Sequence, residues 1–460
     1  LAPAAQSSEL ITTTRTISYT YDPLGRLTAA DYSTGESFEY AYDAVGNRTA
    51  MTDTAGSHTY TYDQGCSILT NFFSNQAFSG NFLVNLTIGG QNMLTSFLFK
   101  VKDHRRKQGQ RYQLGHILLF SILAIMSNAD SYRKVHAFIE THYTTLDEIF
   151  DLKWKGIPAH TTIRYIIRGV SSTEIETCFR DHAAELTTNA NGRRFVAFDG
   201  KVLRGSFDHF KDQRAIQILS AFLTDSNIIL AHEEIAEKTN EIPTAQEMMT
   251  KLGLSGCTFT FDAINCQEKT LETAKETSND VIVQVKENQK TLYNDCETTA
   301  EAVLPNDVYQ EPMVKTRNRI ESRKVEVFTN MIISDADKWH LVEAIVRVER
   351  RKHIFDTKTK CWKQSDETSF YIATTIFSAE TFCQAIRNHW GIENRNHYVR
   401  DVSLGEDRSR IRDNPHIFAK LRSFALNILR ANQVSNIKLD LFKNCMNLDR
   451  VLGYAGIIQN

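Results

Sequence analysis

Hydrophobic and polar positions change their spacing several times along the chain. Residues 19–64 alternate tyrosines with small polar residues and turn at glycines, a pattern that predicts short β-hairpins. Residues 114–150 and 161–187 space their apolar side chains as helices do. Pro158, followed by Thr161 or Thr162, supplies a helix start signal between them. We therefore predict an all-helical domain over residues 101–190.

From Arg193 onwards, short apolar runs alternate with helical stretches. Strands are predicted at 195–198, 216–223, 227–235, 257–261 and 281–285, and helices at 243–252, 266–277 and 290–302. Three strands precede the first of these helices, and strands and helices alternate after it. This order predicts an α/β fold with a mixed sheet flanked by helices. β character returns over residues 306–375, and a long helix is predicted from about Ala379 to Val402.

The tyrosine-rich beginning is repetitive. YTYDPLGRLTAADY (Tyr19–Tyr32) and YAYDAVGNRTAM (Tyr40–Met51) recur about every 20 residues, and a partial third copy follows. The units resemble the YD repeats of Rhs-type shell proteins, which bury their faces only by stacking on neighbouring repeats. So few copies cannot build an enclosing shell, and residues 1–66 are therefore interpreted as a remnant.

The segment that follows, residues 67–100, is predicted as a junction. No charged residue occurs from Gln64 to Phe99. Two interpretations stay open, a strand-rich connector and translated DNA between two fused genes. The chain begins with Leu1, from which we expect a longer reading frame.

Composition narrows the class of protein. The net charge is −2, so any surface for nucleic acid must be a local basic patch. The eight cysteines form no CxxC pair, which argues against a zinc cluster or a disulfide framework and favours reduced thiols in a cytoplasmic protein. The most apolar run, Leu114–Met126, is too short to span a bilayer and is predicted as a buried helix. No signal peptide is visible, and we expect no membrane association.

Three carboxylates are candidates for chemistry. Asp199 and Asp262 follow predicted strands, and Glu393 lies on the predicted late helix. Strand ends meet at one edge of an open α/β sheet, where carboxylates would repel one another unless a hard divalent cation such as Mg²⁺ bound there. A lone aspartate after a strand is more often a turn residue, so spacing alone does not decide. Glu406 and Asp407 are alternatives to Glu393, although we expect them to pair with the nearby Arg408, Arg410 and Arg412.

Seven motifs in a fixed order favour the functional interpretation. They are FDGKVLRGS, EKTNEI, FDAINCQ, VKENQ, RIESR, HWGIEN and EDRSRIR. Together they resemble the Rhs-linked, H-repeat-associated insertion-sequence transposases over about residues 101–432. The resemblance implies a DDE transposase with a ribonuclease-H-like core that uses Mg²⁺ or Mn²⁺. Its catalytic and metal-binding triad falls on Asp199, Asp262 and Glu393.

The same resemblance divides the chain and implies its partners. Residues 101–190 match the family's helical N-terminal domain, 191–305 the first part of the core, 306–375 a β-rich insertion and 376–432 the C-terminal helices of the core, with a tail over 433–460. The expected partners are DNA, as element ends and as target, and a second copy of the chain in a synaptic homodimer. We expect the protein to be associated with a bacterial nucleoid.

The chain departs from the pattern of the wider family on the late helix. Ile386, His389 and Arg400 occupy positions where the wider group has Tyr, Arg and Lys. At α-helical spacing, His389, Glu393 and Arg400 share one face of the helix. Arg400 is therefore expected to reach a DNA phosphate.

Further residues are candidates for contacts with DNA. The set combines basic, amide and aromatic side chains in or near the motifs and basic runs: Lys201, Gln267, Lys286, Gln289, Arg319, Arg323, His389, Trp390, Arg400, Arg105, Arg106 and Lys107. Alternatives stay open for several of them. Lys201 is a phosphate ligand or a solvated lysine, the amides bind DNA or cap helices, and Trp390 stacks on a base or lies in the core. No role follows from the sequence for Asn240 and Glu241.

Three functions are therefore weighed. In the first, a DDE transposase cuts the element's end with water activated at a metal centre, and the resulting 3′-hydroxyl attacks target DNA. In the second, an inactive fusion of a Rhs remnant and a transposase at most binds DNA. In the third, which the short repeat region disfavours, the chain is a Rhs-type toxin nuclease.

Overall fold

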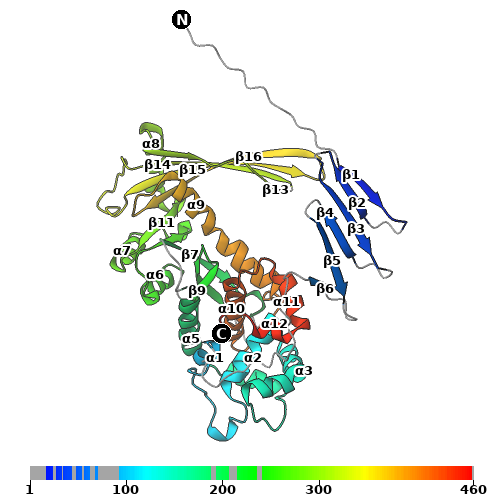
Figure 1. The fold of residues 1–460 in the computed structure, drawn as a ribbon. Coiled ribbons are helices and arrows are strands. Elements are labelled where there is room, and N and C mark those ends of the chain that lie inside the picture. Colours follow the sequence, from blue (N-terminus) through cyan, green and yellow to red (C-terminus); the bar gives the residue numbers. More distant parts are fainter. Residues whose placement is uncertain are drawn as a thin grey trace. The chain divides into compact units, whose positions relative to one another are not determined.

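The computed structural model divides the chain into two compact units, Leu1–Asn85 and Leu86–Asn460, which are described separately (Figure 1). It describes residues 17–23, 27–33, 35–43, 48–53, 56–62, 68–70, 93–187, 193–206, 215–235, 241–316 and 318–457. Most of the predicted junction, residues 71–92, lies outside this range.

The first unit is an antiparallel sheet in which neighbours in sequence are neighbours in space. Its strands are β1 (Ile17–Tyr21), β2 (Leu27–Tyr32), β3 (Ser37–Tyr42), β4 (Arg48–Asp53), β5 (Gly56–Tyr62) and β6 (Ile68–Thr70). Each full repeat unit forms one hairpin, β1 with β2 and β3 with β4. The predicted hairpins are therefore confirmed.

The second unit begins with helices. These are α1 (Met93–Leu98), α2 (Leu114–Met126), α3 (Tyr132–Phe150), α4 (His160–Arg168) and α5 (Ser172–Leu186). Every residue of α2 is buried, which confirms the predicted buried helix. The C-terminal helices α10 (Pro415–Ala431), α11 (Ile437–Met446) and α12 (Leu448–Leu452) share the same hydrophobic core. None of the described helices combines the length and the apolar character that crossing a bilayer requires.

A ten-stranded mixed sheet forms the rest of the core, as the alternating pattern predicts. Its strands are β7 (Arg194–Val202), β8 (Gln217–Leu223), β9 (Ile228–Ile235), β10 (Cys257–Phe261), β11 (Asp280–Val285), β12 (Asp307–Gln310), β13 (Val314–Thr316), β14 (Arg319–Phe328), β15 (Ala344–Asp356) and β16 (Cys361–Ala373). Their order is β12-β14-β15-β16-β11-β10-β7-β8-β9, and β13 pairs with β14. β10 runs parallel to both β7 and β11, and all other pairs are antiparallel. The strands of 306–375 therefore extend the same sheet (Figure 1).

Helices cover both faces of this sheet. Phe198 packs on one face with residues of α6 (Glu241–Leu252), α7 (Glu268–Glu276) and α8 (Lys290–Ala302). Phe195, on the other face, packs beside residues of α9 (Ala379–His389). Successive side chains of a strand alternate between faces, so Asp199 lies on the face that α9 covers.

Two predicted boundaries are wrong. β7 does not end before Asp199 but continues to Val202, because its antiparallel pairing with β8 continues that far. The α-helical hydrogen bonding of α9 ends at His389, and two π-helical segments follow, η6 (Ile392–His397) and η7 (Val399–Ser403). In η6 the amide of Tyr398 donates to the carbonyl of Glu393, five residues back. A π-turn holds one more residue than an α-turn, so α-helical spacing no longer predicts which residues share a face.

Candidate active site

The parallel pair β7–β10 places Asp199 near Asp262. Its register runs from Arg194 opposite Cys257 to Ala197 opposite Thr260. The pairing ends there; Asp199 and Asp262 come two residues further on, Asp262 just past the end of β10, so this register brings the two aspartates to the same part of the sheet. Their side chains are 36% and 47% exposed, so both carboxylates are open to a ligand.

Each aspartate has its own supporting contacts. His397 Nδ1 lies 3.3 Å from Asp199 Oδ2, and the histidine is mostly buried. Asp262 Oδ1 accepts a hydrogen bond from the amide of Ala263 at 2.6 Å and lies 3.5 Å from Lys286 Nζ. Lys286 is exposed, so it stays a candidate for contact with DNA. His397 was not a candidate from the sequence, where no motif distinguishes it from the neighbouring polar residues.

Amide side chains hold the turn after Asp262. Asn288 Nδ2 donates to the carbonyl of Ala263 at 2.7 Å, and Gln289 Nε2 donates to that of Cys266 at 2.9 Å. Gln289 therefore holds the turn after Asp262 in place. The sequence had suggested two other roles for this amide, capping of a helix and contact with DNA. Gln267 stands at the N-cap position of α7 without a side-chain capping bond, which leaves its amide for other partners.

Glu393 lies on the segment η6, which packs against β7, but its own side chain is exposed. Within the described part of the chain, no three His, Cys, Asp or Glu side chains are gathered as a metal-ligand set. The three predicted carboxylates are thus not brought together in this structure. His397, on the same segment, is the residue that reaches Asp199.

The chemistry of the donors nevertheless fits a hard divalent cation. Two adjacent, half-exposed carboxylates supply oxygen ligands of the kind that Mg²⁺ and Mn²⁺ prefer. Their charges also act on the buried His389: burial lowers the pKa of this histidine, and the negative charges of Asp199 and Asp262 offset part of that effect. The region around these two aspartates therefore has a negative electrostatic potential.

The neighbouring residues His389 and Trp390 differ in their exposure to solvent. His389 is buried, and its Nδ1 lies 2.9 Å from the hydroxyl of Thr260, two residues before Asp262. It supports the strand rather than facing DNA. Trp390 is 42% exposed, so the core interpretation of this tryptophan is wrong and a surface for stacking remains.

Lys201 and Arg400 belong to a buried ion network, which speaks against their predicted phosphate contacts. Lys201 is 8% exposed and pairs with Asp401, and its Nζ lies 3.7 Å from Glu406 Oε2. Arg400 is 1% exposed, and its Nη2 lies 2.8 Å from Glu406 Oε1. Glu406 therefore pairs with these two cations and not with Arg408, Arg410 or Arg412. The prediction that His389, Glu393 and Arg400 share one face of a helix was wrong, because the residues after His389 form π-turns and not α-helical turns.

Three basic runs of the sequence lie at residues 105–111, 315–323 and 347–352, and ion pairs within the protein neutralise most of their charges. Arg105 is buried against Asp103, whereas Arg106 and Lys107 are exposed and stay candidates for DNA contacts. Arg323 is buried and pairs with Glu311 and Glu321, and Arg319 also pairs with Glu321. Arg317, in the same basic run, lies outside the described residues.

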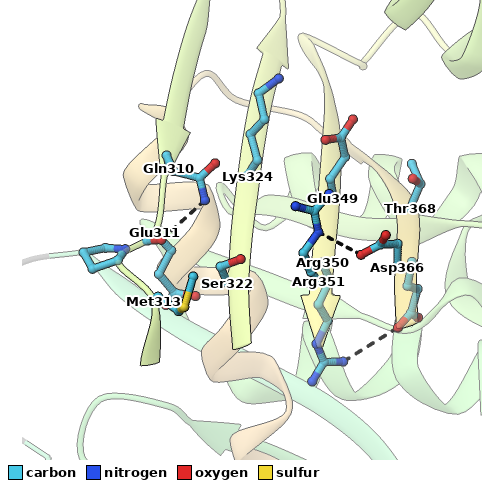
Figure 2. Close-up of a pocket in the computed structure, with 12 residues that line it drawn as sticks. Gln310, Glu311, Met313, Ser322, Lys324, Glu349, Arg350, Arg351, Asp366 and Thr368 are labelled. Atoms are coloured by element: carbon cyan, nitrogen blue, oxygen red, sulfur yellow. Dashed lines mark hydrogen bonds and ion pairs between the residues drawn. The ribbon is translucent and has the colours of Figure 1, made fainter. Parts of the chain in front are cut away.

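Arg350 and Arg351 of the third basic run line a surface depression between β12 and β16, which Figure 2 shows. There Arg351 Nε donates to Asp366 on the next strand at 3.0 Å. Arg350 pairs with Glu321 and lies 3.9 Å from Glu367. Cross-strand ion pairs thus compensate these arginines, and none of the three predicted catalytic carboxylates lines the depression.

Comparison with known proteins identifies the class. The family described as "Transposase DDE domain" matches residues 190–428, and the family "DDE_Tnp_1-associated" matches residues 95–183. The chain therefore belongs to the DDE transposase family.

Two curated relatives from Escherichia coli (strain K12) are each 30% identical to this chain over 343 residues: "Putative protein YbfL" and "H repeat-associated putative transposase YhhI". Each alignment covers 73% of this chain and 89% of the relative. A solved piggyBac transposase synaptic complex with hairpin DNA is 10% identical over 77% of each chain, with a TM-score of 0.36. A TM-score this low establishes neither fold nor function.

Proposed function

We propose that this transposase cleaves DNA and transfers strands at a divalent-metal centre held by Asp199, Asp262 and Glu393. One observation carries the proposal, the β7–β10 register, which ends two residues before each aspartate and so brings Asp199 and Asp262, both partly exposed, to the same part of the sheet. Glu393 is the third carboxylate because the family motif falls on it and because its segment contacts Asp199 through His397. Mg²⁺ or Mn²⁺ would activate water and stabilise the leaving oxygen when bound.

The chemistry is a pair of displacements at phosphorus. In the first, the oxygen of water bonds to phosphorus at the element's end, and the bond from phosphorus to O3′ breaks. The products are a 5′-phosphate and a 3′-hydroxyl, which takes up a proton. In the second, that 3′-oxygen bonds to a phosphorus of target DNA and displaces its O3′. The chain's own residues position the reacting groups and balance their charge.

The strand order also supports a ribonuclease-H-like core. An antiparallel meander of three strands, β9-β8-β7, is followed in the sheet by β10 and β11, which run parallel to β7. In this proposal the strands of 306–375 are an insertion that prolongs the core sheet. The first unit, with its hairpin repeats, would be a Rhs-type remnant.

DNA is the proposed partner, through element ends and target sites in a bacterial nucleoid. Arg106, Lys107, Lys286 and Trp390 support it because they are exposed and lie on transposase-matched segments. A synaptic homodimer follows from the family resemblance. Neither the inactive fusion nor the toxin nuclease is favoured by the family match and the transposase relatives.

The test is an end-cleavage assay with the full chain. Labelled DNA carrying the sequences that flank the gene is incubated with Mg²⁺, Mn²⁺ or EDTA. We expect metal-dependent cuts at the ends, and their loss in Asp199→Asn and Asp262→Asn. Glu247→Gln is the control, because Glu247 is exposed on α6 and, among the described residues, pairs with Lys251 at the surface. Cleavage that survives Asp199→Asn or EDTA would refute the proposed centre. Cuts without any preference for the ends would instead favour the toxin nuclease. Absence of both cutting and binding would favour the inactive fusion.

A further inference from the structure

A further carboxylate, Glu241, lies beside the two aspartates. Glu241 begins α6, on the sheet face opposite to α9. Its Oε1 accepts a hydrogen bond from Asn265 Nδ2 at 3.0 Å. Asn265 belongs to the short turn that directly follows Asp262. One oxygen of the Glu241 carboxylate is therefore held at the end of β10.

The other oxygen lies against the backbone next to Asp199. A Cβ placed on Gly200 would lie 2.6 Å from Glu241 Oε2, closer than real atoms approach. Glycine at this position therefore makes room for the carboxylate. With one oxygen at the turn after Asp262 and the other against Gly200 of β7, Glu241 lies between the two segments that carry the aspartates.

Polar atoms without protein partners surround this location. Asn265 is fully buried, and its Oδ1 has no hydrogen-bond partner among the described residues. On the other face of the sheet, Nε2 of His397, whose Nδ1 lies 3.3 Å from Asp199 Oδ2, also has no hydrogen-bond partner among the described residues. Buried polar groups are rarely left unpaired, so such atoms indicate missing ligands. A cation with its coordinated waters would supply partners of the required kind.

The electrostatics agree with the geometry. Burial raises the pKa of Glu241, and the negative charges of Asp199 and Asp262 raise it further, against the hydrogen bond from Asn265, which lowers it. Carboxylates that share a site without a counter-ion repel in this way. A bound divalent cation removes the repulsion.

We propose that Glu241 is an additional metal ligand of the active site, which binds the divalent cation together with Asp199 and Asp262. The three side chains are not gathered as a ligand set in this structure, so binding of the cation brings them closer together. It approaches from the sheet face opposite to the segment that carries Glu393. The proposal rests on the proposed function, since the cation is the one that the cleavage reaction uses. It also gives a role to the end of the EKTNEI motif, whose first four residues lie outside the described range.

Binding of Mn²⁺ to the full chain without DNA tests the proposal, by isothermal titration calorimetry and by the loss of the free-ion electron paramagnetic resonance signal. Glu241→Gln keeps an oxygen that accepts from Asn265, so it removes the charge and retains the hydrogen bond. We expect it to weaken Mn²⁺ binding by at least about tenfold. Glu247→Gln, on the same helix, should bind as the unmodified protein does. End cleavage by Glu241→Gln should need correspondingly more Mn²⁺.

Asp199→Asn separates this proposal from the proposed function. If Asp199→Asn loses Mn²⁺ binding while Glu241→Gln keeps it, Glu241 is not a ligand and the metal centre stands. If Asp199→Asn also binds as the unmodified protein does, the centre itself is wrong. The metal-free Glu241→Gln protein should melt at or above the midpoint of the unmodified chain, because a repelling charge is gone. A lower midpoint together with lost binding would indicate a structural role and overturn the proposal.

Discussion

Arg400 and Glu406 form a fully buried ion pair, with Nη2 2.8 Å from Oε1, directly after the segment that carries Glu393. Burial raises the pKa of Glu406, but Arg400, then Arg422 and Lys201, overcome this and hold it below its usual value. The pair therefore fixes the end of the π-helical segment to the core.

Breaking this pair should destabilise the protein. Arg400→Met leaves the charge of Glu406 buried without its main partner and should lower the free energy of unfolding by about 3 kcal/mol. This is the lower end of the range for buried pairs, because Lys201 still lies near Glu406. Urea unfolding measures the loss. The double variant Arg400→Met/Glu406→Gln should recover most of it, and Arg410→Met, at an exposed site, should cost under about 0.5 kcal/mol. If the refolded double variant binds DNA with a smaller salt dependence, Arg400 is a phosphate ligand after all.

Adjacent arginines in the first basic run should behave differently. Arg106→Ala removes an exposed charge and should lower the slope of log affinity against log salt by about 0.9, without changing the melting midpoint. Arg105→Ala should instead lower the midpoint, because its guanidinium donates to the carbonyls of Gly109 and Tyr112. Fluorescence anisotropy over a salt series measures the slope. An unchanged slope in Arg106→Ala would exclude this run from the DNA interface.

Trp390 should contribute stacking without contributing stability. Trp390→Ala is expected to weaken binding of DNA with unpaired bases at the element's end by about 1–3 kcal/mol, the range for one base stacked on an aromatic ring. Trp390→Phe should retain most of the affinity. Trp362→Ala is the matched control, since that tryptophan is 46% exposed on the β15–β16 hairpin. Equal losses from both alanine variants would refute a specific role for Trp390.

Acid should destabilise the helical part of the second unit through His116. Burial lowers the pKa of His116 to about 4, against 6.5 for the free side chain. The unfolded chain therefore binds more protons between these values, and stability that is complete above pH 6.5 falls as the pH drops towards 4, by at most about 3 kcal/mol. Urea midpoints over this pH range should show a shallower fall in His116→Phe. Replacement of exposed His340 by Gln should leave the pH dependence unchanged.

Sequence periodicity predicted the elements well wherever one pattern fits one structure. The apolar run of α2, the hairpins of the first unit and the alternation of strands and helices are examples. The expectation that Asp199 and Asp262 each follow a strand was correct for Asp262 alone, because β7 continues past Asp199 to Val202. Their approach to the same part of the sheet could not be derived, because it depends on the register of β10 against β7.

Other features depend on contacts between distant segments. Lys201 pairs with Asp401, and Arg323 pairs with Glu311, which directly follows the neighbouring strand β12, so basic residues that looked available are neutralised. Glu241 had no role in the sequence because only the folded chain brings it to Gly200 and Asn265. The π-turns were missed since their apolar spacing over one or two turns resembles that of an α-helix.

The π-helical segment after His389 has a consequence for comparing sequences. Each π-turn is equivalent to inserting one residue into a regular α-helix, with the residues beyond it rotated relative to those before it. In a relative with a continuous α-helix here, a basic residue on the same side of the helix as the glutamate would follow it after fewer residues than in this chain. Counting positions from Glu393 therefore does not identify the functional equivalent of a family lysine in this chain. Only alignment in space, turn by turn, can do so.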